Sequence, residues 1–443
     1  MRTIIVGGVA AGMSAASRIK RDSKDSEVVV YEMGEHVSYG ACGLPYFIAD
    51  YNTDWQKLIA RPLEKFIEAG IDVRLRHEVV RVQPDLKTVL IRNHSTGDVF
   101  TDKYDTLFIA TGAQPIMPAW PGIELPGVFS LKSLTDSFAI KEAIKQSAVR
   151  HVTIIGGGYI GVEMIEAAVA LGKTVRCIEA VDRILTPFEP EMSELATRAI
   201  LDQGVEINLA ERVVALEGKS HIEAVRTDRG TYQTDLVIVA VGVKPATAFL
   251  QSTGIRMAAN GALVIDREMR TSLPGIYAAG DCALVHHRIS EDNHFLPLGT
   301  NANKLGRLAA QNMLGTHQKY AGTLGSAAIK VFELELARTG LSEIDCQRLG
   351  IDYQSIVVTA GDHPAYYPNP KPIRFKLIYE RQSKKILGAQ AAGEQGAVLR
   401  IDALAIALHA GLTTTELSQV DLCYAPPFAS VWDVIHIACQ AAK

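Results

Sequence analysis

The chain has 443 residues and a formal net charge of -4; 48% of its residues are hydrophobic and 36 are glycine. A chain of this length exceeds one ordinary core, which predicts two or three domains, and the composition is typical of a compact α/β enzyme. The small negative charge argues against a general affinity for nucleic acid or anionic membranes, and no apolar run approaches the roughly 20 residues of a membrane span.

The first residues and the cysteines indicate the compartment. Met1 and Arg2 lead directly into the apolar stretch TIIVGG, so we expect no secretory leader. The six cysteines form no Cys-x-x-Cys pair and no zinc-like spacing, so the sequence predicts neither a disulfide framework nor a metal site. These observations together predict a cytoplasmic protein.

The stretch TIIVGGVAAGMSAASRIKR is predicted to form a buried strand, a tight glycine turn and an amphipathic helix. Gly7 and Gly12 hold two positions of the dinucleotide-binding fingerprint, while Val9 stands at its middle glycine position. Glu32 ends the next strand, 20 residues after Gly12 (32 − 12 = 20). This layout places a helix N-terminus at a pyrophosphate and an acid at a ribose, although a glycine turn made for packing is the alternative.

The next segment, SYGACGLPY, holds Cys42 between small residues with no second cysteine nearby. An isolated buried thiol usually serves only packing. The position of Cys42, directly after the first strand–helix–strand unit, favours a reactive thiol instead.

A second fingerprint follows in HVTIIGGGYIGVEMIEAAVALGKTVRCIEA. Gly156, Gly158 and Gly161 fill all three glycine positions, and Glu179 ends the following strand, 18 residues after Gly161 (179 − 161 = 18). Because the pattern occurs twice, each time with its acid, it predicts two dinucleotide sites rather than two packing turns.

Later strands end in small or polar residues. YDTLFIATGAQP ends at Ala110–Gly112, and TDLVIVAVGVKP repeats that design after the second fingerprint. TSLPGIYAAGDCA places Asp281 just beyond a strand at a predicted helix start, where a carboxylate can hold a polyol or simply cap the helix. Near the C-terminus, IRFKLIYE and KILGAQAAG are predicted as neighbouring strands, followed by the apolar helix AVLRIDALAIALHAG.

Together, Glu32, the ATG segment, the complete second fingerprint and the IYAAGD segment resemble the flavoprotein disulfide reductases over nearly the whole chain. The resemblance implies a glutathione-reductase-like α/β fold with two Rossmann-like dinucleotide-binding domains and a C-terminal α+β dimerisation domain. The implied units are an FAD-binding domain (1–112 and 246–322), an NAD(P)H-binding domain (113–245) and an interface domain (323–443) that forms a homodimer.

The same resemblance implies FAD at the first site, with Asp281 on its ribitol, and a nicotinamide nucleotide at the second. Tyr159 resembles the aromatic gate that covers the flavin, with a packing tyrosine as the alternative. Glu179 favours NADH because a carboxylate repels the 2′-phosphate of NADPH, but Arg176 and Arg183 could soften that repulsion, so use of both nucleotides is open. The implied FAD residues are Gly7, Val9, Ala10, Ala11, Gly12, Glu32, Val79, Ala110, Thr111, Gly112 and Asp281. The implied NAD(P)H residues are Gly156, Gly158, Tyr159, Ile160, Gly161, Glu179 and Gly242.

Most members of that superfamily carry a second redox cysteine where this chain has Phe47. Cys42 must therefore cycle as a sulfenic acid or as a mixed disulfide with a small thiol. Both routes need a thiolate, which a nearby helix N-terminus and electron exchange with the flavin would favour. The segment SYGACGLPY resembles the single-cysteine branch, which includes coenzyme A disulfide reductases, NADH oxidases and NADH peroxidases.

Basic residues on the first helix favour coenzyme A as the partner thiol. Ser14, Arg18 and Arg21 share one helix face and, with Ser38, resemble the coenzyme A pocket of the family, although a basic helix face is more often simply solvated. Arg61 and Lys65 could add charge, but the sequence does not place them.

Two tyrosines near the C-terminus point the same way. Tyr424 precedes Ala-Pro-Pro, and HPAYYPNP supplies a second tyrosine, for which spacing favours Tyr366 over Tyr367. The resemblance implies that both act as catalytic residues at the thiol of the other subunit, with packing anchors as the alternative. The His-Glu pair of two-cysteine relatives is absent, because His436 lacks its Glu.

We therefore predict a flavoprotein that uses NAD(P)H to reduce coenzyme A disulfide, or related mixed disulfides and persulfides, through FAD and a Cys42–S–S–coenzyme A mixed disulfide. The main alternative is a water-forming NADH oxidase or an NADH peroxidase that cycles Cys42 through sulfenic acid. A reductase for a protein partner such as a ferredoxin is disfavoured, because such relatives lack this cysteine. A nucleotide sensor without catalytic activity is disfavoured by the placed thiol.

Overall fold

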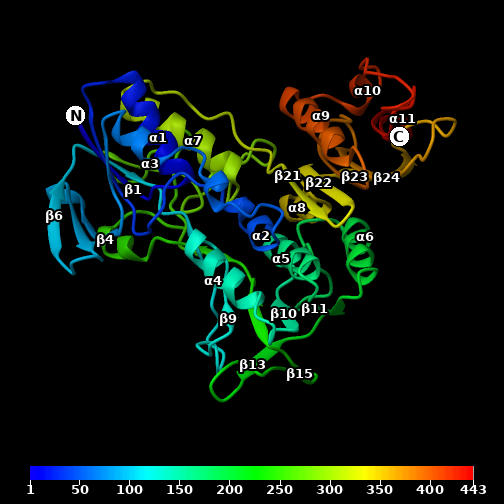
Figure 1. Ribbon diagram of the computed structural model, residues 1–443. Coiled ribbons are helices and arrows are strands. Elements are labelled where there is room, and N and C mark those ends of the chain that lie inside the picture. Colours follow the sequence, from blue (N-terminus) through cyan, green and yellow to red (C-terminus); the bar gives the residue numbers. More distant parts are fainter. Residues whose placement is uncertain (443) are drawn as a thin grey trace.

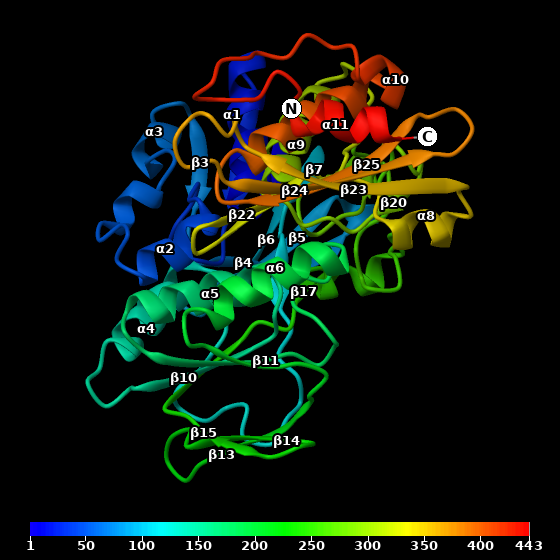
Figure 2. The same ribbon diagram turned by 90° about the vertical axis from the view of Figure 1, so that its right-hand side faces the viewer.

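The computed structural model describes residues 1–442. Figures 1 and 2 show three regions, each built around its own sheet. The N-terminal part of the chain lies beside helix α7 (Gly299–Met313), the middle part forms a separate lobe, and the C-terminal part carries an antiparallel sheet with the helices of residues 397–441 on one side.

The first sheet is parallel and nearly buried, as expected for strands covered on both faces. Helix α1 (Ala10–Asp22) connects the central strand of this sheet to the strand beside it. The buried residues of α1 recur at helical spacing, with polar residues between them. In spatial order the strands are β18 (Ile276–Ala278), β7 (Thr106–Ile109), β1 (Arg2–Val6), β2 (Glu27–Tyr31) and β3 (Ile71–Arg74).

The second sheet repeats this design in the middle of the chain, and helix α5 (Tyr159–Ala170) takes the place of α1. Its parallel strands are β12 (Glu206–Asn208), β11 (Thr174–Ile178), β10 (His151–Ile155), β16 (Leu236–Val239) and β9 (Val128–Phe129). The two chain crossings between the first two regions pair with each other, as β8 (Ala113–Pro115) and β17 (Val243–Pro245). The domain boundaries drawn above stay predictions.

The third sheet is antiparallel and carries helix α9 (Ala397–Ala410) against it. The segments IRFKLIYE and KILGAQAAG are paired strands in it, which confirms the predicted neighbourhood. Its strands are β21 (Ala327–Val331), β22 (Leu334–Gly340), β25 (Ile386–Gly393), β24 (Pro372–Glu380) and β23 (Tyr353–Gly361).

The remaining elements connect or cover these sheets. The helices are α2 (Leu44–Ile48), α3 (Leu63–Ile67), α4 (Leu134–Ile144), α6 (Pro190–Leu201), α7 (Gly299–Met313), α8 (Glu343–Leu349), α10 (Thr414–Leu417) and α11 (Val434–Ala441). The smaller strands are β4 (His77–Gln83), β5 (Thr88–Asn93), β6 (Val99–Lys103), β13 (Val213–Glu217), β14 (Ala224–Thr227), β15 (Thr231–Gln233), β19 (Val285–His286) and β20 (Asn293–His294).

A buried ion cluster ties the middle lobe to the third sheet. The Lys376 ammonium on β24 lies 2.7 Å from Glu191 and 2.9 Å from Glu343, with Glu189 at 3.7 Å. Only 4% of the Lys376 side chain is exposed, so its charge requires these carboxylates. The cluster therefore fixes α6 and α8 against the sheet.

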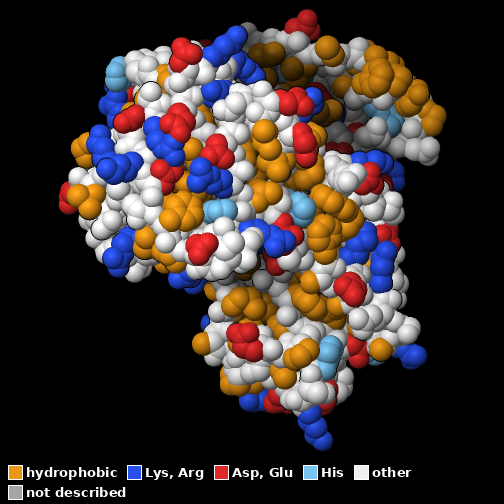
Figure 3. Space-filling model, turned by 60° about the vertical axis from the view of Figure 1, so that its left-hand side comes forward, with side chains coloured by type: hydrophobic (Ala, Val, Ile, Leu, Met, Phe, Trp, Pro, Cys, Tyr) orange, Lys and Arg blue, Asp and Glu red, His pale blue; other side chains and the backbone are white. Residues whose placement is uncertain are grey.

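Two surface observations bear on the opening predictions. Figure 3 shows Lys and Arg side chains interspersed with Asp and Glu over one face, in keeping with the small net charge. Among residues 1–442, no helix is both long and apolar enough to cross a membrane.

Helices α1 and α7 pack unusually closely because Gly306 has no side chain. A Cβ at Gly306 would lie 2.3 Å from the carbonyl oxygen of Ala11. The Ser14 hydroxyl donates to the Asn303 side-chain oxygen at 2.8 Å across the same contact. The first dinucleotide turn therefore rests directly on α7.

Gly306→Ala is expected to lower the free energy of unfolding by about 1–3 kcal/mol, because the added methyl group must push α7 away from α1. Urea unfolding of the purified protein measures this loss. Gly299→Ala is the matched control, since a Cβ at the first residue of α7 would meet nothing within 4 Å. Equal stability of the two variants would contradict the packing argument.

Candidate active site

Cys42 lies in a short 3-10 turn (Ala41–Gly43) that is held against the first glycine turn. The Ser38 amide donates to the carbonyl of Gly8 at 2.9 Å, and the Ala60 amide donates to the carbonyl of Ser38 at 2.7 Å. Ser38 has a φ of 53°, a left-handed conformation that bends the chain toward the cysteine. The thiol is exposed and is not in a disulfide.

Burial and nearby carboxylates raise the pKa of the Cys42 thiol. Partial burial is the largest cause, the carboxylate of Glu163 is next, and Asp281 adds to the same direction, whereas Lys132 opposes them. Burial also raises the pKa of Glu163 to about 7. The expectation that a helix N-terminus favours the thiolate is outweighed here, because only the five-residue helix α2 follows the cysteine and desolvation dominates.

The first glycine turn has the shape that a dinucleotide pyrophosphate requires. Gly7 has a φ of 102°, and a Cβ there would lie 2.3 Å from the Ala110 carbonyl oxygen; at Gly12 it would lie 1.8 Å from that of Gly7. Val9 caps α1, whose first helical residues are Ala10 and Ala11. The structure thus accepts valine at the middle glycine position.

Glu32 directly follows β2 and lies beside the first glycine turn. Its carboxylate accepts from the amides of Gly8 at 2.6 Å and Gly34 at 2.7 Å, which holds it beside the turn where a ribose would bind. Burial raises the pKa of Glu32, and these two bonds oppose that shift.

The other residues implied for FAD come from neighbouring strands. Ala110, Thr111 and Gly112 directly follow β7, and Val79 is buried on β4. Asp281 follows β18 and lies 3.1 Å from the Lys132 ammonium. The prediction that a helix starts at Asp281 is wrong, because the chain makes a turn there. The next helix, α7, begins only at Gly299, after the β19–β20 hairpin.

The second glycine turn is a close copy of the first. A Cβ at Gly156, whose φ is 107°, would lie 2.5 Å from the Ala240 carbonyl oxygen, and one at Gly161 would lie 1.9 Å from that of Gly156. Gly158 caps α5, in whose first turn Ile160 stands. Gly242, with a φ of 120°, follows β16.

Glu179 has the same position at the second glycine turn as Glu32 at the first. Its carboxylate accepts hydrogen bonds from the amides of Gly157 at 2.6 Å and Val181 at 3.0 Å. Of the two arginines that could soften this charge, Arg176 contacts Glu206, donates to Asn208 at 2.8 Å and covers the Tyr232 ring. The Arg183 guanidinium lies 3.3 Å from the Asp182 carboxylate.

Tyr159 is the first residue of α5, directly after the second glycine turn. Its hydroxyl is buried and has no hydrogen-bond partner among the described residues, and burial raises its pKa to about 12. A buried hydroxyl without a partner fits a side chain whose partner arrives with a ligand.

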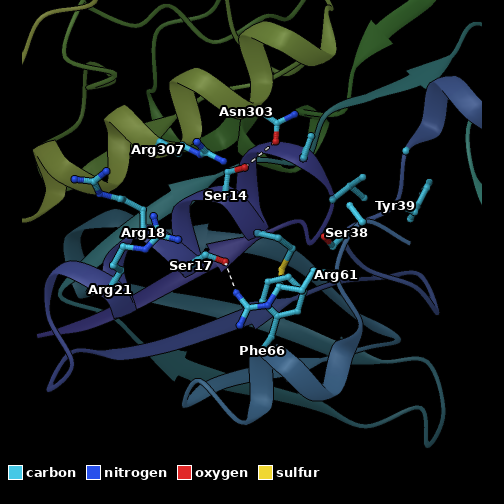
Figure 4. A pocket seen from close by; sticks show the side chains of 15 residues that line it. Ser14, Ser17, Arg18, Arg21, Ser38, Tyr39, Arg61, Phe66, Asn303 and Arg307 are labelled. Atoms are coloured by element: carbon cyan, nitrogen blue, oxygen red, sulfur yellow. Dashed lines mark hydrogen bonds between the residues drawn. The ribbon is translucent and has the colours of Figure 1, made fainter. Parts of the chain in front are cut away.

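A cavity of about 370 Å³ lies along the outer face of α1. It brings together all four residues predicted for coenzyme A: Ser14, Arg18, Arg21 and Ser38. Figure 4 shows that the cavity also collects side chains from α3 and α7. The complete lining is Val9, Ala10, Met13, Ser14, Ser17, Arg18, Arg21, Ser38, Tyr39, Gly40, Ala60, Arg61, Phe66, Asn303 and Arg307.

The two tyrosines predicted at the C-terminal end meet each other. The hydroxyls of Tyr366 and Tyr424 lie 2.7 Å apart, so one donates to the other, and this bond raises the pKa of Tyr366. Tyr367 instead packs its ring against His363. His436 is buried, and its Nε2 lies 2.9 Å from the carbonyl oxygen of Val420.

The chain matches the pyridine nucleotide-disulphide oxidoreductase family over residues 1–305 and the dimerisation domain of that family over residues 326–434. It belongs to this family. The predicted fold class is thereby confirmed, and the protein is an FAD- and NAD(P)H-dependent oxidoreductase, as members of the family are.

Relatives and solved structures match along the whole chain. A protein named NAD(P)H coenzyme A polysulfide/persulfide reductase, from Pyrococcus horikoshii, is 38% identical over 100% of this chain and 98% of its own length. The coenzyme A disulfide reductase of Staphylococcus aureus is 30% identical over 100% of both chains. The crystal structure of reduced Bacillus anthracis CoADR-RHD has a TM-score of 0.96 and 37% identity, covering 100% of this chain and 80% of that one. Proteins named NADH oxidase match at 30% and 32% identity.

Several residues at these sites escaped the sequence reasoning. Lys132 and Glu163 face Cys42 from the middle lobe, and Asn303 and Arg307 reach the cavity from α7. The i, i+4 spacing of Asn303 and Arg307 puts them on one helix face, but nothing local tells which surface that face meets.

Glu163→Gln is expected to lower the pKa of the Cys42 thiol, because it removes a like charge that raises it. Above a pH of about 7, where Glu163 is ionised, iodoacetamide should alkylate Cys42 of the variant faster than Cys42 of the wild type. Below that pH the two rates should converge, since Glu163 is then neutral.

Peptide mass spectrometry of the holoenzyme measures the alkylation rate. Glu194→Gln is the control, because Glu194 pairs with Arg198 on the exposed side of α6. Indistinguishable pH profiles for wild type and Glu163→Gln would show that Glu163 does not act on the thiol.

Proposed function

We propose that this protein uses NAD(P)H to reduce coenzyme A disulfide, or related coenzyme A mixed disulfides and persulfides, with Cys42 as the redox thiol. The observation that carries the proposal is the arginine-rich cavity that runs along α1 and reaches Ser38–Gly40, just before Cys42. A phosphate-bearing thiol is the kind of ligand that such a cavity binds. The relatives whose names include coenzyme A support the same choice.

FAD is assigned to the first glycine turn and a nicotinamide nucleotide to the second. Gly7 and Gly12 leave room for a pyrophosphate at α1, and Glu32 is positioned to accept from a ribose hydroxyl. Gly156, Gly161 and Glu179 do the same at α5. Bound FAD supplies the two-electron step between the nicotinamide and the sulfur chemistry.

Cys42 carries the exchange chemistry as a thiolate. It attacks one sulfur of coenzyme A disulfide, so that a Cys42–S–S–coenzyme A bond forms, the original S–S bond breaks and one coenzyme A thiolate leaves. Two electrons that originate from NAD(P)H then cleave the mixed disulfide, and the second coenzyme A leaves. The second thiol thus replaces the cysteine that is missing at Phe47.

The tyrosine pair is assigned to proton transfer. Hydroxyls 2.7 Å apart can pass a proton, and a phenol can protonate the departing thiolate. Both side chains are exposed, 72% for Tyr366 and 47% for Tyr424, and within residues 1–442 of one chain neither forms a hydrogen bond with Cys42. They are therefore assigned to the thiol of a second subunit.

A homodimer built on the C-terminal region provides that arrangement. Leu399 and Ile406 lie two turns apart on α9 and are each 73% exposed, an apolar stripe that a second copy would cover. Phe428 and Trp432, on the segment that carries Tyr424, are also exposed. The matched dimerisation domain includes all of these residues.

Glu179 supports NADH as the preferred nucleotide, because the Arg176 guanidinium is engaged elsewhere. The exposed Cys42 keeps open the second candidate, an NADH oxidase or peroxidase that forms a sulfenic acid. Neither alternative requires the arginine-rich cavity, which is why disulfide reduction is preferred. The cytoplasmic location stays a prediction.

The purified protein is expected to carry an adduct of coenzyme A size on Cys42 that a reductant removes. Intact mass with and without reductant, followed by peptide mapping, measures this. Cys42→Ser should lose both the adduct and coenzyme A disulfide reduction while flavin reduction by NADH persists, because the thiol is needed only after that step. An unmodified Cys42 combined with rapid oxygen consumption would favour the oxidase.

Tyr366→Phe and Tyr424→Phe are each expected to lower kcat for coenzyme A disulfide by roughly 100-fold, the scale of a lost general acid. The double variant should lose little more than either single one, since the hydroxyls act as a pair. Tyr367→Phe, on the same loop but packed on His363, is the control. Unchanged turnover in both single variants would contradict the assignment.

A further inference from the structure

Two separate loops carry the paired tyrosines. Residues 362–371 form the loop of the β23–β24 hairpin, which presents Tyr366. Residues 421–433 follow α10, lead into α11 and present Tyr424. Figure 2 shows the two loops, coloured orange and red, reaching out side by side. The 2.7 Å contact between the two hydroxyls therefore depends on how the loops are held relative to each other.

The base of the first loop is fastened by Asp362. Its amide donates to the Lys371 carbonyl at 2.8 Å, and its carboxylate accepts from the Lys371 amide at 2.8 Å. The same carboxylate lies 2.9 Å from Nδ1 of His363, whose Nε2 lies 3.1 Å from the carbonyl oxygen of Pro368. Asp362 and His363 are both buried. These bonds fix the ends of the loop, while Tyr366 lies on its exposed part.

The second loop is held at both ends by residues at the start of α11. Asp433 ends the loop and caps α11, because its carboxylate accepts from the Ile435 amide at 3.0 Å. His436 on α11 places its Nε2 2.9 Å from the carbonyl oxygen of Val420, just before the loop begins. The residues between these two points, Tyr424 among them, therefore form a loop whose two ends are fixed on one helix.

Arg400 on α9 joins the bases of the two loops. Its Nη2 donates to the carbonyl of Asp362 at 2.9 Å and lies 2.8 Å from the Asp433 carboxylate, to which its Nε also donates at 2.9 Å. Its Nη1 donates to the carbonyl of Gly396, at the start of α9, at 3.1 Å. Only 11% of the Arg400 side chain and 8% of the Asp433 side chain are exposed, so water competes little for these bonds. A planar guanidinium with five donors can make all of them at once.

We propose that Arg400 is a positioning residue for proton transfer: by bonding to the base of each loop, it sets the distance between the Tyr366 and Tyr424 hydroxyls. The inference rests on the proposed function, which assigns proton transfer to that pair. Hydroxyls must lie within hydrogen-bond reach to pass a proton, so a small shift of either loop interrupts the transfer. With Arg400 in place, the two phenols reach the thiol of a second subunit as one preformed unit.

The test uses Arg400→Met/Asp433→Asn, which removes the bridge without leaving a buried unpaired charge, while the asparagine can still cap α11. Arg381→Met/Asp352→Asn is the matched control. It removes an Arg–Asp pair with a 2.9 Å bond at the opposite end of the β23–β24 hairpin. Arg400→Lys is a second, milder variant, because a lysine keeps the charge beside Asp433 but lacks the planar set of donors.

In the holoenzyme, Arg400→Met/Asp433→Asn should lower kcat for coenzyme A disulfide roughly tenfold, leave KM within about twofold and leave flavin reduction by NADH unchanged. Arg400→Lys should show the same division between kcat and KM, and the control should behave as wild type. Introduced into Tyr424→Phe, the Arg400 and Asp433 changes should cost less than about twofold, because the pair is already interrupted. An equal loss in both backgrounds, as a general loss of packing would give, or a wild-type kcat in the Arg400 variants would overturn the inference while leaving disulfide reduction intact.

A second readout does not need turnover. Hydrogen exchange followed by mass spectrometry should show that residues 362–371 and 421–433 both exchange faster in Arg400→Met/Asp433→Asn and keep their wild-type rates in the control. Faster exchange in only one of the two loops would contradict the bridge. If even the wild type does not reduce coenzyme A disulfide but both loops loosen together, the proposed function fails and the bridge stands.

Discussion

The backbone hydrogen bond from the Ser38 amide to the Gly8 carbonyl joins the segment before Cys42, the proposed redox thiol, to the first glycine turn. Gly8 belongs to the turn that Glu32 holds from the other side, so one short stretch of backbone positions the acid, the helix N-terminus and the cysteine segment together. This rigidity matters because a single thiol without a resolving neighbour must meet both its electron donor and its substrate at one place.

Helix α1 serves two sites with different faces. Its N-terminus forms the glycine turn, its inner face packs against the sheet and α7, and its outer face lines the cavity. Since Gly306 lets α7 approach the backbone of Ala11, Asn303 and Arg307 are carried into that cavity as a consequence of packing. The first glycine turn and the cavity proposed for the thiol substrate are therefore parts of one packed unit.

The charges near Cys42 act, on balance, against the thiolate form of its side chain. Glu163 and Asp281 raise the pKa of the thiol, and Lys132, whose ammonium is only 3.1 Å from Asp281, offsets them incompletely. Within the described chain, burial and these carboxylates therefore favour the protonated thiol.

Local patterns were sufficient for the two glycine turns and their acids, because each is set by backbone conformation within about 30 consecutive residues. The basic face of α1 and the two exposed tyrosines were also readable, since helical spacing and short loop segments carry them. Tertiary contacts alone decided the rest. Arg307, Lys132 and Glu163 come from segments far from Cys42 in the chain, and long-range packing determines which side chains face one another. For the same reason, the pairing of Arg176 with Glu206 and the turn at Asp281 were not predicted from the sequence.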